Sequence, residues 1–307
     1  MSVTYGLDKA ATEGRESAVA VGVFDGVHWG HRAIFERLIA AARELDAKSV
    51  ALTFDRHPVE VLAPTRAPQY INTLEQRVEL IRAVGVDEVV VAEFTPELAA
   101  LPREDFVRGV LIGALKAKHV VVGSNFRFGR NREGDTRYLQ SFLPELGVGI
   151  SVVSAVIIGG GPASSTRVRM LVSRGDIEEA AKILGRRFTL RGIVVKGEQV
   201  GRAIGFPTSN IQVGARQLLP ARGVYVVEAA IHGTTYKGVC NIGVRPTFRG
   251  ERETVEVHLD GFQGTLYGET LDVVFCRRLR DEMTFESPEK LADQIRKDLE
   301  RAGGPCE

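Results

Sequence analysis

The pattern of predicted elements changes once along this chain, near Gly185, and that change limits the folds it can adopt. Before Gly185, buried apolar runs at residues 17–21, 49–54 and 118–123 alternate with amphipathic helical segments. A strand, a helix and a second strand in succession imply a right-handed crossover and a parallel sheet. We therefore expect residues 1–185 to form a Rossmann-like, doubly wound α/β domain.

The second part of the chain has a different composition. Only residues 287–301 show helical spacing, with three apolar side chains on one stripe, whereas the rest consists of short β-rich runs separated by turn residues. These runs are residues 188–196, 224–231, 235–242, 254–259 and 271–276. We expect residues 186–307 to form an antiparallel β-barrel with a C-terminal helix.

Charge and cysteine content narrow the class of protein. The 307 residues include 40 basic and 39 acidic side chains, so no net field favours nucleic acid or an anionic membrane. Cys240, Cys276 and Cys306 are far apart and outside any C-x-x-C pair, which is typical of free thiols in a reducing compartment. The first fifteen residues lack a signal-peptide core, and no stretch approaches membrane-span length. We expect a soluble, cytoplasmic protein.

Residues 22–31, with the sequence GVFDGVHWGH, lie between a predicted strand and a predicted helix. A glycine turn at a helix N-terminus presents backbone N–H groups and the positive end of the helix dipole, which suits a phosphate. His28 and His31 are three residues apart, so both imidazoles share one face of the first helical turn and can donate to a phosphoryl group. The alternatives are a metal-binding pair or two capping histidines. The segment is not a P-loop.

Three other segments of the first domain carry candidate residues. His57 follows the strand at 49–54 and is expected in the same crevice, although a solvated loop histidine fits the spacing equally well. The loop at 123–135 mixes glycines, basic groups and two phenylalanines, which suits a nucleotide; the alternative is that the phenylalanines only anchor the loop. Hydroxyls at 164–166 are followed by a helix with two arginines in its first turns, which predicts either a second anion site or an ordinary N-cap.

Two segments of the second domain are chemically distinctive. Residues 206–210, FPTSN, offer a hydroxyl at Thr208 and an amide oxygen at Asn210, which are hard neutral ligands of the kind that suits Mg²⁺; without other evidence such a segment is an ordinary turn in most proteins. Glu256 and His258 alternate with apolar neighbours, so both face the same side of a strand. Glu256 is either a functional carboxylate or part of a solvated polar face.

Together these motifs resemble a known family. The sequence G-x-F-D-G-x-H-x-G-H at 22–31 resembles the FAD synthetase branch of the nucleotidylyltransferases, as do the N-F-x-F-G loop at 125–129 and S-S-T-x-x-R at 164–169. The P-T-x-N element at 207–210 resembles that of riboflavin kinases. From about Ser17 to Ala302 the chain resembles the bacterial bifunctional riboflavin kinase/FAD synthetases. This resemblance implies two reactions: riboflavin and ATP give FMN and ADP, and FMN and ATP then give FAD and pyrophosphate.

The resemblance also implies roles for individual residues. Glu256 would be the base that takes the ribityl hydroxyl proton, and His28, His31 and Arg169 would stabilise the α-phosphate and the leaving pyrophosphate. Mg²⁺ would be bound at Thr208 and Asn210. The expected nucleotide-binding residues are Gly22, Phe24, Asp25, Gly30, Asn125, Ser164, Ser165, Thr166, Gly197, Gly201, Gly205 and Thr208. The expected flavin-binding residues are His57, Phe126, Phe128, Asn241 and Arg280.

The expected ligands are thus riboflavin, FMN, FAD and ATP, with no nucleic acid or membrane partner, for a monomer or weak homo-oligomer. Two other functions are compatible with parts of the pattern. One is a nucleotidylyltransferase acting on a different phosphate ester, with a barrel that only binds. The other is a flavin-responsive regulator or flavin carrier without turnover, which would have no need of a base such as Glu256.

Overall fold

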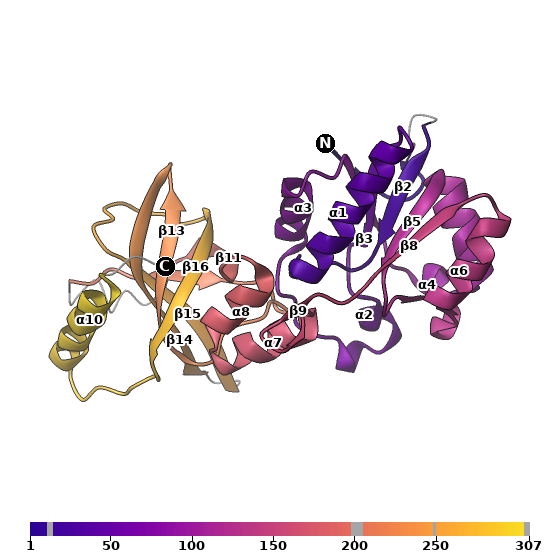
Figure 1. Ribbon diagram of the computed structural model, residues 1–307. Coiled ribbons are helices and arrows are strands. Elements are labelled where there is room, and N and C mark those ends of the chain that lie inside the picture. Colours follow the sequence, from indigo (N-terminus) through magenta and orange to yellow (C-terminus); the bar gives the residue numbers. More distant parts are fainter. Residues whose placement is uncertain (11–14, 198–204, 248–249, 304–307) are drawn as a thin grey trace. The chain divides into compact units, whose positions relative to one another are not determined.

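The computed structural model describes the chain except for residues 11–14, 198–204, 248–249 and 304–307 (Figure 1). It divides into two compact units. The first unit contains residues 1–69 and 74–164, and the second contains residues 70–73 and 165–307. Each unit is described by itself below.

The first unit is built on a six-stranded sheet in the order β1-β4-β3-β2-β5-β8, and every adjacent pair is parallel. In that order the strands are Ser2–Tyr5, Glu88–Ala92, Lys48–Phe54, Ser17–Val21, Ala117–Gly123 and Gly149–Val153. The central strand β2 is buried along its whole length, as its small and β-branched residues predict. The predicted α/β architecture is confirmed.

Helices cover both faces of this sheet, because alternate residues of the central strands enter two separate cores. Ala18 and Ala20 face a core with α1 (Trp29–Glu44) and α3 (Leu74–Ala83). Val19 and Val21 face a core with α6 (Thr136–Glu145) and the π-helix at Phe106–Ala114, which continues from α5 (Arg103–Asp105). Short elements occupy the connections: α2 (Pro58–Leu62), Pro64–Arg66, α4 (Pro96–Ala100), β6 (Arg127–Phe128), Arg130–Arg132, β7 (Gly134–Asp135), β9 (Ile157–Ile158) and β10 (Gly161–Pro162).

The second unit is a closed antiparallel barrel in the order β11-β12-β15-β14-β13-β16. In that order the strands are Thr189–Val195, Ser209–Gln212, Gly250–Leu259, Thr234–Thr247, Gly223–Ile231 and Thr270–Arg280. The C-terminal helix α10 (Pro288–Ala302) packs through Leu299 and Ala302 on Val224, Val226 and Val239 of the barrel. The predicted barrel with one C-terminal helix is confirmed.

Helices α7 (Ser165–Arg174) and α8 (Ile177–Leu184) precede the barrel, and they belong to the second compact unit. The sequence analysis placed them in the first domain, up to Gly185. The last turn of α8 ends at Gly185 in a left-handed conformation, which glycine adopts without steric cost.

The cysteines differ from one another. Cys240 is a buried free thiol, and burial raises its pKa. Cys276 is disulfide-bonded, so the prediction of free thiols is wrong for this residue. The prediction for Cys306 falls outside the described residues. None of the helices in the described part of the chain combines the length and the apolar character that a membrane crossing requires.

Candidate functional site

The loop that joins β2 to α1 has a strained backbone. Phe24, Gly26 and Val27 have φ angles of 53°, 90° and 40°, all in the left-handed region. This region is costly for a bulky residue and above all for a β-branched one such as Val27. Backbone strain of this kind persists only where surrounding contacts hold it, and it is concentrated at functional sites.

The two histidines of the loop lie against each other. The ring centroids of His28 and His31 are 3.7 Å apart with an interplanar angle of 21°, and the ring of Phe24 meets His31 edge-on at 5.3 Å. His28 is the N-cap residue of α1, but its side chain makes no capping hydrogen bond. In the described part of the chain, no three His, Cys, Asp or Glu side chains are grouped so that they could hold a metal ion. The two histidines thus lie at the N-terminus of α1, a position where a bound anion is favoured.

Position 30 favours glycine because another segment of the main chain passes close to it. A Cβ at this position would lie 3.0 Å from the carbonyl oxygen of Ala163 and 3.1 Å from Cε1 of His28. The segment that begins at Ala163 is thus brought against the histidine loop within the first unit, and Ser164 follows directly. Ser165, Thr166 and Arg169 lie on α7, in the second unit.

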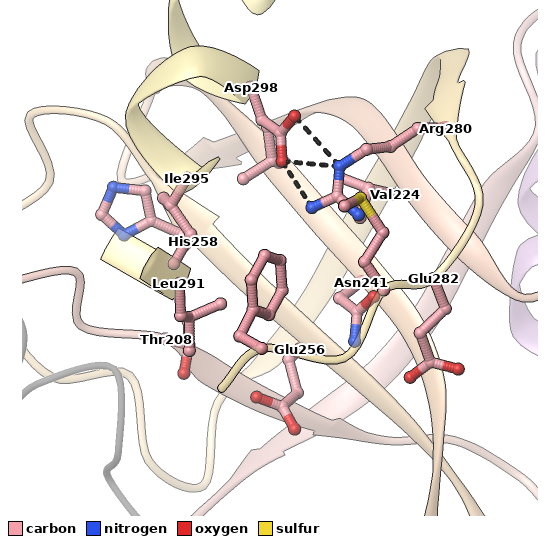
Figure 2. Close-up of a pocket in the computed structure, with 13 residues that line it drawn as sticks. Thr208, Val224, Asn241, Glu256, His258, Arg280, Glu282, Leu291, Ile295 and Asp298 are labelled. Atoms are coloured by element: carbon pink, nitrogen blue, oxygen red, sulfur yellow. Dashed lines mark hydrogen bonds and ion pairs between the residues drawn. The ribbon is translucent and has the colours of Figure 1, made fainter. Parts of the chain in front are cut away.

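A cavity of about 320 Å³ lies on the face of the barrel that α10 covers (Figure 2). Its lining includes four of the predicted site residues, which come from three strands of the second unit and from the segment that precedes β12. They are Thr208, Asn241, Glu256 and Arg280. Leu291 and Ile295 of α10 line the same cavity.

Strand register explains why polar groups meet there. Glu256 on β15 is paired with Asn210 on β12 and with Asn241 on β14. Paired residues of antiparallel strands place their side chains on the same face, so these three form one polar row across the sheet. Val255 and Val257 are buried on the opposite face, and Glu256 is the side chain of this row on β15 that lines the cavity, together with Glu282 and Asp298 from other segments.

His258 holds the PTSN segment next to this row. Its Nδ1 donates a hydrogen bond to the carbonyl oxygen of Pro207 at 2.9 Å, and its ring meets Phe206 edge-on at 5.5 Å. Because Thr208 follows Pro207, this bond restrains the main chain that carries Thr208, which lines the same cavity as Glu256. The sequence analysis assigned His258 no role, although its alternation with Glu256 placed it on the same face.

A buried ion pair joins α10 to the barrel at the other side of the cavity, marked by dashed lines in Figure 2. The guanidinium of Arg280 donates from Nη2 to Oδ2 of Asp298 at 2.7 Å and from Nε to the same carboxylate at 3.1 Å. Its Nη1 donates to the carbonyl oxygen of Asp281 at 2.9 Å, and Gln294 donates to Oδ1 of Asp298 at 2.9 Å. The Arg280 guanidinium is thus engaged in holding α10 and the start of the following loop.

Comparisons with known proteins match both parts of the chain. The family model for FAD synthetase matches residues 10–167, and the model for riboflavin kinase matches residues 184–304. The bifunctional riboflavin kinase/FMN adenylyltransferase of Escherichia coli (strain K12) is 37% identical over 96% of this chain and 93% of its own length. The chain belongs to the bifunctional riboflavin kinase/FMN adenylyltransferase family.

Other relatives extend over nearly the whole chain. The Pseudomonas fluorescens bifunctional riboflavin kinase/FMN adenylyltransferase is 37% identical over 98% of this chain and 97% of its own. A crystal structure described as that of a macrolide-efflux protein from Streptococcus pneumoniae matches with a TM-score of 0.87 and 31% identity, covering 98% of both chains. The chain is therefore a two-activity enzyme that converts riboflavin to FMN and FMN to FAD.

Two of the predicted flavin-binding residues in the first unit, His57 and Phe128, make contacts within the protein itself. His57 caps α2: its Nδ1 accepts from the N–H of Val59 at 3.2 Å, and Glu60 completes the capping box. Phe128 is buried in the core, with ring centroids 5.4 Å from Phe106. For Phe128 the structure therefore favours the anchoring interpretation.

The neighbours of Phe128 are more accessible. Asn125 is exposed, and Phe126 is half-buried and stacked on Phe128 with centroids 5.4 Å apart. These two residues remain the nucleotide and flavin candidates of that loop.

The structure describes two of the three glycines that were predicted to bind the nucleotide in the second domain. A Cβ on Gly197 would overlap the side-chain amide of Asn210, so glycine allows this close approach. Gly205 has a φ of 87°, which favours glycine on conformational grounds. Gly201 lies outside the described residues.

The donors around Glu256 fit a magnesium ion bound with a nucleotide. The Thr208 hydroxyl, the Asn210 amide and the Glu256 carboxylate all offer oxygen, which is what Mg²⁺ prefers. Mg²⁺ is usually held by one or two protein oxygens together with phosphates and water, rather than by a full protein cage. Thr208 and Asn210 are the residues that would hold it, and the bound ion would offset charge on the transferred phosphoryl group.

Proposed function

We propose that Glu256 is the catalytic base of the riboflavin kinase reaction. The supporting observation is its place in the barrel cavity, in one row with Asn210 and Asn241 and next to Thr208. The 5′-hydroxyl of the ribityl chain is a weak nucleophile, so phosphoryl transfer from ATP benefits from a carboxylate that accepts its proton. Asn241 would contact the flavin, and Arg280 would shape its pocket by holding α10.

The adenylylation of FMN needs no base, because the attacking FMN phosphate is already ionised at neutral pH. We assign His28 and His31 to stabilising the charge that develops on the α-phosphate of ATP and on the leaving pyrophosphate. The stacked pair at the start of α1 supports this role. Gly22, Phe24, Asp25 and Gly30 would shape the loop around the nucleotide.

Further assignments rest on the motifs of the chain. Ser164, Ser165, Thr166 and Arg169 would bind the ATP phosphates through the S-S-T-x-x-R motif, and Asn125 would bind the adenosine. His57 and Phe126 would border FMN, and Gly197, Gly205 and Thr208 would border the ATP of the kinase reaction. Residues 1–185 would then serve FAD synthesis and residues 186–307 riboflavin phosphorylation. A cytoplasmic location and a monomeric or weakly oligomeric state complete the proposal.

Two substitutions in the full chain test the separation of roles. Purified protein is incubated with ATP, Mg²⁺ and either riboflavin or FMN, and the flavins are separated by chromatography. We expect His28→Ala to impair FAD formation while FMN formation continues, and Glu256→Ala to do the reverse. Equal damage to both steps by each substitution, in folded protein, would show that the two-site assignment is wrong.

A further inference from the structure

Arg77 is among the largest fully buried side chains of the described residues. It lies on α3 in the first unit, and only 2% of it is exposed. Burying a guanidinium is costly unless its N–H groups are hydrogen-bonded. The groups that Arg77 binds therefore indicate what the burial achieves.

Those groups include two main-chain carbonyls at the ends of neighbouring strands. Nη1 donates to the carbonyl oxygen of Val23 at 2.8 Å, and Nη2 donates to the carbonyl oxygen of Phe54. Val23 lies two residues after the last residue of β2, and Phe54 is the last residue of β3. The Val23 carbonyl accepts a second bond, from the hydroxyl of Thr53 at 3.0 Å. The Arg77 guanidinium thus holds together the C-terminal ends of two adjacent parallel strands, where the loops of an α/β site begin.

The Val23 carbonyl directly precedes the strained part of the loop that carries His28 and His31. Phe24 follows Val23 with a φ of 53°, and its ring meets the edge of His31. A Cβ on Gly22 would lie 2.8 Å from the ring of Phe24, so the ring folds back over the main chain. Fixing the Val23 carbonyl therefore fixes the peptide that orients Phe24, and Phe24 supports the ring of His31.

We propose that Arg77 is a positioning residue for FMN adenylylation, which holds the Val23–Phe24 peptide so that the His28–His31 pair is correctly oriented. This inference rests on the role proposed above for the two histidines. Arg77 acts through the main chain. A fork of two N–H groups can hold both carbonyls at once in a fixed geometry, whereas the single ammonium of lysine lacks that geometry.

The test compares Arg77→Met and Arg77→Lys with Arg82→Met in the full chain. Arg82 is on the same helix and is exposed, so it controls for the loss of an arginine from α3. The riboflavin kinase activity of the other unit serves as an internal control for intact protein. Misplacing a catalytic group by about 1 Å can lower a rate about 100-fold. We expect Arg77→Met to lower kcat for FAD formation by about 10- to 100-fold, with the KM for FMN within about twofold of wild type.

Two further results should accompany that loss. Arg77→Lys should retain an intermediate kcat, because the charge remains while one carbonyl bond is weakened. Deuterium exchange of the amides of residues 22–28 should be faster in both Arg77 variants and unchanged in Arg82→Met. Riboflavin phosphorylation should be unchanged in all three proteins.

A wild-type kcat for FAD formation in Arg77→Met overturns the inference, as does an equal loss of both activities. If Arg77→Met does not fold, Arg77→Lys decides: a kcat and an exchange pattern equal to those of Arg82→Met overturn it. His28→Ala, measured alongside, separates the two proposals. Full FAD formation by His28→Ala refutes the role of the histidine pair, whereas loss in His28→Ala without loss in the Arg77 variants refutes only the positioning role.

Discussion

The ion pair between Arg280 and Asp298 should contribute strongly to the stability of the barrel unit. Its side chains are 15% and 1% exposed, and the carboxylate receives bonds from two guanidinium nitrogens and from Gln294. Asp298→Asn keeps the shape of the side chain but removes its charge, which leaves the Arg280 guanidinium without its buried counter-ion. Breaking a buried pair by removing one partner costs about 3–5 kcal/mol. Because the amide still offers one acceptor oxygen, we expect about 3 kcal/mol.

For a unit of about 150 residues this loss corresponds to a Tm lower by about 6–12 °C. The chain has a single tryptophan, Trp29, which lies in the first unit, so its fluorescence reports the unfolding of that unit alone. Circular dichroism of the full chain reports both units. We expect Asp298→Asn to shift the dichroism transition of the barrel while the Trp29 fluorescence midpoint stays unchanged.

A second salt bridge on α10 provides the matched control. Asp293 pairs with Arg296, but these side chains are 63% and 59% exposed. Exposed pairs contribute about 0–1 kcal/mol, so Asp293→Asn should unfold almost as wild type does. Asp298→Asn should also raise the KM for riboflavin, because α10 forms a wall of the cavity that we propose as the riboflavin kinase site. Equal midpoints for Asp298→Asn and Asp293→Asn would refute this reasoning.

Three other perturbations have expected outcomes. Gly30→Ala should lower FAD formation on the order of tenfold, since its Cβ would lie 3.0 Å from a main-chain carbonyl oxygen. A Cβ at Gly109 would have no neighbouring atom within 4 Å, so Gly109→Ala should leave FAD formation unchanged. Chromatography of FAD checks both variants. His258→Phe removes the donor to the Pro207 carbonyl and should raise the KM for ATP in riboflavin phosphorylation about fivefold, with FAD formation as the control reaction. Burial lowers the pKa of His119 below its ordinary value of 6.5, so the unfolded state binds the proton more readily and the free energy of unfolding should fall as the pH drops below about 6.5. His119→Gln should flatten that dependence in urea unfolding between pH 5.5 and 7.5, and an unchanged slope would count against burial as its cause.

The local pattern of the sequence was enough to predict the elements and several site residues. Strand, turn and helix repeat at short range in the first half, and turn-separated strands fill the second, so both architectures follow from periodicity. The i, i+2 alternation around Glu256 placed this carboxylate on the same face of its strand as His258, and the three-residue spacing of His28 and His31 placed their rings together. These features depend only on residues within one turn or one strand of each other.

Tertiary structure decided which distant residues meet. Arg280 and Asp298 are joined through strand-to-helix packing, and Arg77 reaches Val23 across 54 positions of the chain. The burial of Phe128 in the core of the first unit likewise depends on packing that a loop motif does not specify. Such contacts are set by barrel closure, strand register and the fit of buried side chains, and a charged residue on a helix carries no local mark of the carbonyl or carboxylate that it will bind.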